Sequence, residues 1–205
     1  MSPRTDGQNQ IILDRRREEI LNAALTEFAR KGYSGTKISD IAKLGGASQG
    51  LIYHYYASKD ELYAAVIEKS IKDSYKIIEM IEGNGLKGWR ALEAMTKGIL
   101  AWMENAGDEI LNFLFMYQAY MLDPMPECIK LALSKEMRTI PATARMIKAA
   151  QDEGLAVEGD AFFLASMYWS LIQGIIMVTV TSKQIQTNEV YVMPEAAFLL
   201  RLFKK

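Results

Sequence analysis

The chain of 205 residues contains one cysteine, Cys128, and one histidine, His54. A single cysteine cannot form an intramolecular disulfide, and together these two residues cannot supply the ligands of a structural zinc site. The same scarcity leaves no nucleophile–base pair, and no phosphate-binding loop is present, so an all-α enzyme is a poor hypothesis. We therefore expect no metal and no cofactor. Because Lys130 is the only basic neighbour of Cys128, an inert thiol is favoured over a redox sensor.

The chain also lacks an excess of charge of either sign. Lys and Arg number 24 against 25 Asp and Glu, so bulk electrostatics do not point to nucleic acid or to an anionic membrane. Residues 1–10 lack the apolar core of a signal peptide, which predicts a cytoplasmic protein. One uncharged run, residues 161–182, is long enough to span a bilayer. Polar residues within it, and the lack of a second run, favour a helix buried in a core or dimer interface.

Nearly all of the sequence between glycines and prolines has helical periodicity, and no convincing strand or repeat is present. We predict an all-α protein of about nine helices, preceded by a flexible tail at residues 1–13. The first helix is expected at residues 14–32, and Thr36, Ser48 and Ser58 are expected to cap the next three. The second helix is expected at about 37–44, the third from the cap at Ser48 to about 55, and the fourth at 59–81. The remainder is expected to form four to six helices, with spans at 86–105, 108–122, 127–137, 142–153, 160–183 and 189–203 and with Pro141 as one of the breaks.

The first three helices have the spacing of a helix-turn-helix motif. Apolar residues of the second helix are expected to face Ile52 and Tyr56 of the third, which lie one turn apart. Such packing turns Gln49, Gly50, Tyr53 and His54 outward and leaves Leu51 at the boundary. In this motif the third helix presents its N-terminal residues to base edges in the major groove.

Residues 32–38 (GYSGTKI), 46–56 (GASQGLIYHYY) and 58–62 (SKDEL) carry a more specific signal. Together they resemble the DNA-binding domain of TetR-family transcriptional repressors over about residues 17–65. The resemblance implies a DNA-binding domain at residues 14–62, a connecting helix at 59–82 and a ligand-binding and dimerisation domain at 63–205. Ala47, Tyr56 and Lys37 depart from the usual residues of the family, and a buried Tyr56 hydroxyl would need a polar partner.

The resemblance also implies which residues contact DNA. Tyr53, Tyr55 and Lys59 match positions that contact phosphates, and Gln49 is suited to reading adenine. The complete expected set is Thr36, Lys37, Ser48, Gln49, Gly50, Leu51, Tyr53, His54, Tyr55 and Lys59. The alternative for His54 is that it packs against the protein. For Arg15–Arg17, the start of a solvated helix is favoured over an arm that reads bases. Since residues 1–62 hold nine basic and eight acidic side chains, we expect affinity to depend on local charge placement and on salt.

For the C-terminal part, the resemblance implies a dimer interface formed by the last two helices. The helix at 160–183 is apolar on nearly all sides. A single neighbouring core cannot cover so much apolar surface, so a partner surface is expected. Small residues spaced by four would let a partner helix approach closely. The expected interface residues are Ser166, Ser170, Gly174, Met177, Val192, Ala196, Leu199 and Leu200.

The resemblance also suggests a pocket among the middle helices, which are rich in methionine and aromatic residues. Such side chains adapt to irregular apolar ligands, although they also form ordinary cores. The expected pocket residues are Trp102, Phe113, Met116, Tyr117, Tyr120, Met121, Tyr168 and Gln173. The resulting hypothesis is a homodimeric repressor that a small hydrophobic effector releases from a palindromic operator. The alternative is a helix-turn-helix protein without such an effector, either constitutive or controlled by a partner protein.

Overall fold

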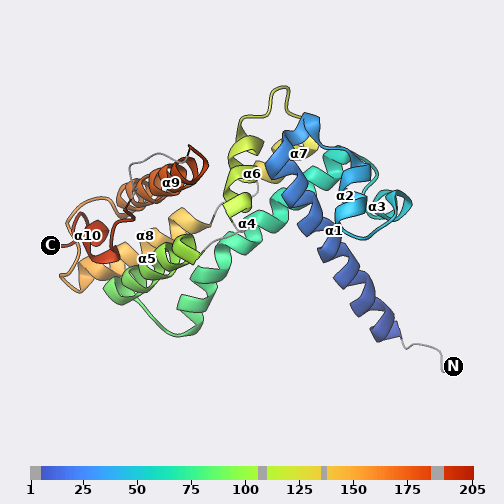
Figure 1. Cartoon of the computed structure of the whole chain (residues 1–205). Coiled ribbons are helices and arrows are strands. Elements are labelled where there is room, and N and C mark those ends of the chain that lie inside the picture. Colours follow the sequence, from blue (N-terminus) through green and yellow to red (C-terminus); the bar gives the residue numbers. More distant parts are fainter. Residues whose placement is uncertain (1–5, 106–109, 135–137, 186–191) are drawn as a thin grey trace. The chain divides into compact units, whose positions relative to one another are not determined.

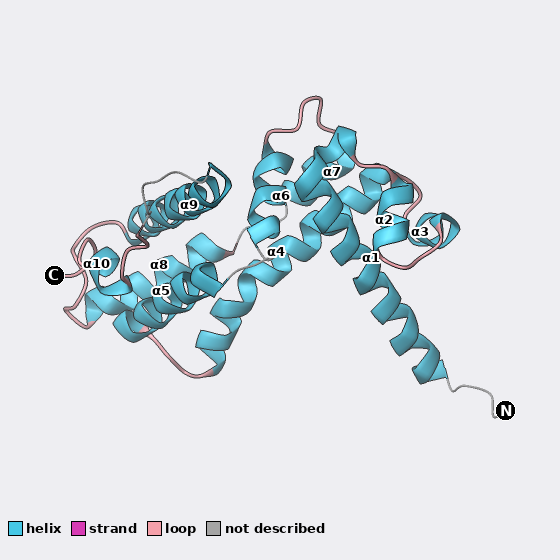
Figure 2. Ribbon diagram, viewed as in Figure 1, coloured by secondary structure: helices cyan, strands magenta, loops and turns pink. Residues whose placement is uncertain are grey.

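The computed structural model describes residues 6–105, 110–134, 138–185 and 192–205, and these residues form helices and no strand (Figures 1 and 2). The prediction of an all-α protein is confirmed. The helices are α1 (Asp6–Gly35), α2 (Ile38–Leu44), α3 (Gln49–Tyr55), α4 (Lys59–Gly83), α5 (Gly88–Asn105), α6 (Ile110–Tyr120), α7 (Glu127–Ser134), α8 (Thr139–Asp152), α9 (Ala161–Ile185) and α10 (Ala196–Leu200).

The helices form two compact units. Unit 1 consists of Met1–Lys72 and Leu111–Glu136, and unit 2 consists of Asp73–Ile110 and Met137–Lys205. The boundary lies within α4, which runs from one unit into the other. This division differs from the expected one, because α6 and α7 pack with the N-terminal helices. Phe115 of α6 explains the difference: its ring centroid lies 4.8 Å from that of Tyr63 and 6.2 Å from that of Phe28.

The core of unit 1 joins α1–α4 to α6 and α7. Phe28, Ile41, Ile52, Leu62 and Phe115 are all buried in one continuous cluster. Burial of each such side chain contributes about 1.5–3 kcal/mol to folding. Helices α1–α3 are therefore held by a core that also includes α6.

The structure corrects two boundaries in this unit. The first helix begins at Asp6, so residues 6–13 are helical rather than a tail; Met1–Thr5 lie outside the described residues. Gly32, expected at the end of this helix, has the positive φ of 71° typical of a helix C-terminus, and a short helical segment follows it to Gly35. Thr36 does not cap α2, since Lys37 occupies the capping position.

Unit 2 consists of the end of α4 together with α5, α8, α9 and α10. Tyr168 is buried, and its hydroxyl lies 3.0 Å from that of Thr96 on α5. Trp169 Nε1 donates to the Thr143 hydroxyl of α8 at 2.9 Å. These two bonds fix α9 to two neighbouring helices and satisfy polar atoms inside an apolar core.

Two predicted helix boundaries in unit 2 are wrong. Pro141 lies in the first turn of α8 and not in a break, because proline is tolerated where the helix has no backbone acceptor for an N–H. The last helix was expected at residues 189–203, but α10 covers only Ala196–Leu200, and residues 192–195, which contain Pro194, are not helical. Residues 186–191 lie outside the described part of the chain.

Candidate DNA-binding interface

The turn between α2 and α3 is built by two adjacent glycines. Gly45 N donates to the Ile41 carbonyl at 2.9 Å, and Ala47 N donates to the Ala42 carbonyl at 2.9 Å. Gly46 has φ of 59°, which favours glycine. A Cβ on Gly45 would lie 3.2 Å from Ala23 Cβ, so the turn packs tightly against α1. This close approach fixes where α3 begins.

Helix α3 is capped as predicted. Ser48 Oγ accepts a hydrogen bond from Leu51 N at 3.1 Å, which satisfies one free amide of the first turn. Ile52 is buried, and Leu51 is half-buried at the edge of the core. The outward face of α3 carries Gln49, Gly50, Tyr53 and His54, all of which are exposed. The helix therefore offers a row of polar and aromatic groups to a partner outside the protein.

The end of α3 is tied to α1 through Tyr56, which is buried. Arg17 Nε donates to the Tyr56 hydroxyl at 3.1 Å and supplies the polar partner that a buried tyrosine requires. Burial raises the pKa of Tyr56, although the hydrogen bond from Arg17 opposes the shift. Arg15 and Arg16 both pair with Glu19, at 3.1 Å and 2.7 Å. In this structure the three arginines thus bond to residues of unit 1.

Two of the residues expected at DNA are directed inward. The Thr36 side chain is buried, and its hydroxyl donates to the carbonyls of Gly32 at 2.7 Å and Glu27 at 3.1 Å. Tyr55 is half-buried, and its hydroxyl is enclosed without a hydrogen-bond partner among the described residues. Tyr55 lies one helical turn after Leu51, on the side of α3 that leans toward the core. Neither side chain presents its hydroxyl to solvent, which corrects the expected contact set.

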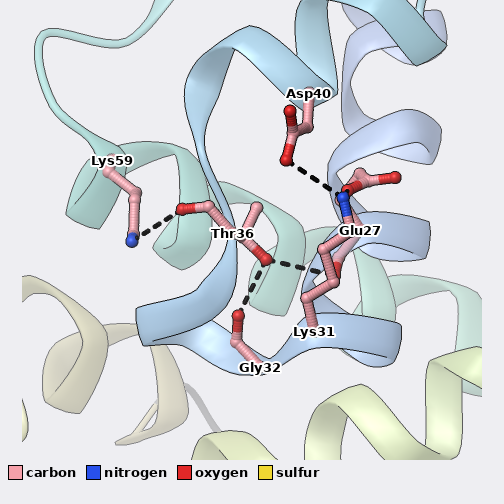
Figure 3. A network of polar contacts seen from close by, with 6 residues as sticks. All are labelled: Glu27, Lys31, Gly32, Thr36, Asp40 and Lys59. Carbon is pink, nitrogen blue, oxygen red and sulfur yellow. Dashed lines mark hydrogen bonds and ion pairs between the residues drawn. The ribbon is translucent and has the colours of Figure 1, made fainter.

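Lys59 is also engaged within the protein (Figure 3). Its Nζ donates to the Thr36 carbonyl at 2.9 Å and lies 4.4 Å from the centroid of the Tyr33 ring. Burial lowers the pKa of Lys59, while the neighbouring Asp60 opposes the shift. The Tyr33 hydroxyl donates to the Asp60 carboxylate. The end of α1, the start of α2 and the start of α4 therefore meet at Lys59.

Ion pairs of Lys31 join α1 to α2 at the same junction. Lys31 of α1 pairs with Asp40 of α2 at 3.0 Å and also with Glu27 of its own helix (Figure 3). The carboxylate of Asp40 has a lowered pKa, chiefly because of the hydrogen bond from Lys31. Sequence reasoning did not identify Tyr33, Lys31 or Asp40. Only Tyr33 carried a signal, as part of the GYSGTKI run.

Four of the eight expected pocket residues lie on α6, and a fifth, Met121, follows it directly. Leu111, Phe115 and Ala119 bury one side of α6 in unit 1, and Met116 is half-buried and packs against the same core. Phe113 is half-buried, whereas Tyr117, Tyr120 and Met121 are exposed. A largely aromatic surface is thus exposed on a helix that is packed against the core of unit 1.

The other three expected pocket residues belong to unit 2. Trp102 of α5 and Gln173 of α9 are exposed. Tyr168 is an ordinary core residue, because it is fully buried and its hydroxyl is bonded to Thr96. The structure does not bring the eight expected pocket residues together within one unit. Tyr168 is packed inside the core of unit 2.

Some of the expected dimer-interface residues are accessible at the surface, and others are buried within the chain. Ser166 and Met177 are half-buried, Ser170 and Gly174 are exposed, and a Cβ on Gly174 would meet open space. Leu199 and Leu200 are buried inside unit 2, which corrects their assignment to an interface. Their neighbours Phe198 and Leu202 are exposed instead. Val192 is 78% exposed and Ala196 half-buried, but Val192 lies before α10 and not on it.

Helix α9 contains a long apolar stretch. By length and composition, Ala161–Ser182 could cross a membrane, with a mean hydropathy of 1.7. Only 22% of that stretch is buried in the single chain. Among the described residues, no group of three or more His, Cys, Asp or Glu side chains could hold a metal ion.

The geometry of α1–α3 defines a helix-turn-helix domain of the kind that binds DNA. Residues 20–66 match the family described as bacterial regulatory proteins, tetR family. The match covers α2, α3 and parts of α1 and α4. Over 70 residues the chain is 41% identical to the HTH-type transcriptional repressor SCO4008 of Streptomyces coelicolor; this alignment covers 34% of the chain and 36% of that protein.

Solved structures extend the likeness to the whole fold. One is a transcriptional regulator from Saccharomonospora viridis in complex with choline, with a TM-score of 0.75 and 19% identity; the match covers 94% of this chain and 99% of that one. Another is the SmeT–triclosan complex of Stenotrophomonas maltophilia SmeT, with a TM-score of 0.70, 18% identity and coverage of 93% and 92%. At such identities the likeness shows the all-helical fold alone.

Proposed function

We propose that this protein is a homodimeric, sequence-specific DNA-binding transcriptional regulator. The observation that carries the proposal is the outward face of α3, where Gln49, Gly50, Tyr53 and His54 are all exposed on a helix fixed at both ends. Polar groups on a rigid helix can meet base edges in a major groove. SCO4008 is a repressor, and we extend repression to this chain as part of the proposal.

Within this proposal the contacts divide by chemistry. Gln49 reads an adenine, Leu51 is placed for a thymine methyl, and Tyr53 and His54 bond to phosphates or base edges. Lys37 and Lys43 of α2 are exposed and contact phosphates. Ser48 acts mainly through its cap. Thr36 and Tyr55 are left out of the contact set because their hydroxyls are enclosed in the protein.

A second copy of the chain is the proposed partner of α9. Its outward face carries Phe163, Met167, Leu171 and Val178, which are 62%, 45%, 37% and 45% exposed. A continuous apolar surface of this kind marks a protein or membrane interface. The open backbone at Gly174 allows another helix to approach closely. Two-fold symmetry then requires a palindromic operator. A cytoplasmic location fits this assembly better than a membrane span.

A small hydrophobic effector is proposed to act at the outward face of α6. The same helix contacts the DNA-binding core through Phe115 and through Gln118, whose Nε2 donates to the Ala29 carbonyl at 3.0 Å. An effector that prefers one position of α6 would therefore shift the DNA-binding helices by its differential affinity for the two states. The two solved neighbours are complexes with choline and with triclosan. The alternative is a regulator without an effector.

The test is fluorescence anisotropy of the purified chain with the DNA upstream of its own gene, against a scrambled duplex and across a salt titration. Tight, salt-sensitive binding that resists competitor DNA is expected. If this duplex fails, duplexes selected from a random pool replace it, and failure to enrich any sequence refutes the proposal. A thermal-shift screen of apolar compounds separates the two alternatives, because a ligand stabilises the fold that binds it.

A further inference from the structure

We propose that Lys59 is a positioning residue, whose ammonium holds the start of α2 against the start of α4 and thereby orients the DNA-reading helices. This role rests on the proposed DNA binding and replaces the phosphate contact that the family resemblance implies for Lys59. The two roles are separable by experiment, because a phosphate contact and an internal bond respond differently to salt.

The ammonium of Lys59 has two partners within unit 1. It donates to the Thr36 carbonyl at 2.9 Å, and it lies 4.4 Å from the centroid of the Tyr33 ring. A charged donor to a backbone carbonyl is stronger than a neutral one, and an ammonium over an aromatic face is attracted to the ring. Tyr33 is held in turn, since its hydroxyl donates to the carboxylate of Asp60, the next residue of α4.

Thr36 transmits this bond to the DNA-binding helices. Its hydroxyl is anchored on α1 by the carbonyls of Gly32 and Glu27, and its backbone leads directly into α2 at Ile38. Helix α2 lacks a side-chain cap of its own. The start of α2 is therefore held from outside, by α1 through the Thr36 hydroxyl and by α4 through Lys59.

The Lys59 bond gives a movement of α4 a path to the DNA-reading helices. Lys59 is the first residue of α4, the helix that leaves unit 1. Because the bond from Lys59 joins α4 to Thr36, two residues before α2 begins, a shift of α4 moves α2 and α3 with it. Without the ammonium, the apolar core still folds the unit, but the tilt of α2 relative to α4 is less constrained.

The test compares Lys59→Met with Lys37→Met in the full chain. Met keeps an unbranched apolar stem and removes the ammonium. Lys37 is the matched control, since it is an exposed lysine at the start of α2. Dissociation constants for a selected operator duplex are measured from about 50 to 300 mM KCl. Hydrogen exchange across residues 33–44 is followed in parallel for the same variants without DNA.

Lys59→Met is expected to weaken binding about tenfold at every salt concentration while leaving the slope of log K against log salt unchanged. Lys37→Met is expected to reduce the slope by about 0.9 for each bound protomer. Exchange at residues 36–44 is expected to rise in Lys59→Met and to stay unchanged in Lys37→Met.

A slope that falls in Lys59→Met as it does in Lys37→Met, with unchanged exchange, makes Lys59 a phosphate ligand and overturns the proposal. Unchanged affinity with unchanged exchange also overturns it. If Lys59→Met does not fold, Tyr33→Phe takes its place, because it frees the lysine's aromatic partner from Asp60; raised exchange at 36–44 then supports the role, and normal exchange refutes it. If the wild type binds no selected DNA, the proposed function fails, and the exchange comparison still decides whether Lys59 holds α2.

Discussion

Helices α3 and α9 both expose a face to solvent, but the two faces differ in chemistry and support. Helix α3 is a short helix whose outward residues are polar or aromatic, and its ends are bonded through Ser48 and through Tyr56 to Arg17. Helix α9 is a long helix whose outward residues are apolar, and only its inner face is bonded to neighbours. A polar face on a fixed helix suits a hydrated, charged partner, whereas an apolar face suits a protein surface.

The comparison also shows where precision is needed. In the proposed function α3 must hold its groups in register with base edges, and polar bonds and a close glycine turn fix its position. An apolar interface gains its free energy from area removed from water, which depends less on direction. The site proposed in unit 1 is therefore directional, and the interface proposed in unit 2 is not.

The largest expected effect comes from placing a charge on the α9 face. Phe163→Asp puts a carboxylate in the first turn of α9, where the helix dipole tolerates it, so the fold is preserved. Burying that charge between two copies is unfavourable, so we expect monomers and a loss of operator affinity of about a hundredfold or more. Sedimentation and anisotropy measure the two effects.

The control for that variant is Leu131→Asp on α7, which also adds a charge at an exposed leucine but lies in unit 1. It should leave the oligomeric state unchanged. Dimers of Phe163→Asp that are as stable as the wild type would show that α9 pairs with something other than a second copy.

The next effect tests the polar face of α3. Gln49→Ala removes an exposed side chain that can bond to a base. Loss of one good pairing with adenine costs about 1–3 kcal/mol, roughly a tenfold or greater loss of affinity, and relaxes specificity at one position. Selection of binding sites with the variant measures the change. An unchanged site preference would remove Gln49 from the set of base-reading residues.

Gly50→Ala separates stability from binding. A Cβ at this position meets only Ser48 Oγ at 3.9 Å, so the substitution fits the isolated protein. Alanine in a helix is more favourable than glycine by about 0.5–1 kcal/mol, so the free energy of unfolding should rise. Operator affinity should fall, because the added methyl group stands where the helix backbone approaches DNA. A variant that is both more stable and equally tight in binding would place Gly50 away from the duplex.

The smallest effect is expected at the junction of α3 with α1. Tyr56→Phe removes the hydroxyl that accepts the hydrogen bond from Arg17 and keeps the buried ring. The bond contributes about 1 kcal/mol, so thermal unfolding should shift down by a few degrees. Binding should weaken only slightly. Combining Tyr56→Phe with Arg17→Met tests the pairing, since the double variant should lose little beyond the single ones.

Much of the DNA-binding domain could be predicted because its signals are local. The capping role of Ser48, the break at Gly45-Gly46 and the burial of Ile52 all follow from residues within one or two turns. The outward row of α3 follows from the same spacing. Tyr56 was expected in the core with a polar partner, but the sequence could not name Arg17, which lies 39 positions away.

The errors occurred where distant residues meet. Thr36 was expected to cap α2 and contact phosphate, yet the carbonyls of Gly32 and Glu27 bind its hydroxyl. Leu199 and Leu200 satisfied a helical stripe, and only the packing of unit 2 shows that this stripe faces inward while Phe198 faces solvent.

By itself the sequence determined the all-helical class, the helix-turn-helix and the apolar character of α9, because periodicity, caps and glycines act over a few residues. The tertiary structure alone decided that α6 packs with the DNA-binding helices, that Tyr168 is a core residue and that Lys59 bonds to the start of α2. The physical reason is that such contacts join residues far apart in the chain. Their partners are chosen by shape and by the need to satisfy buried polar groups, and neither is encoded in local spacing.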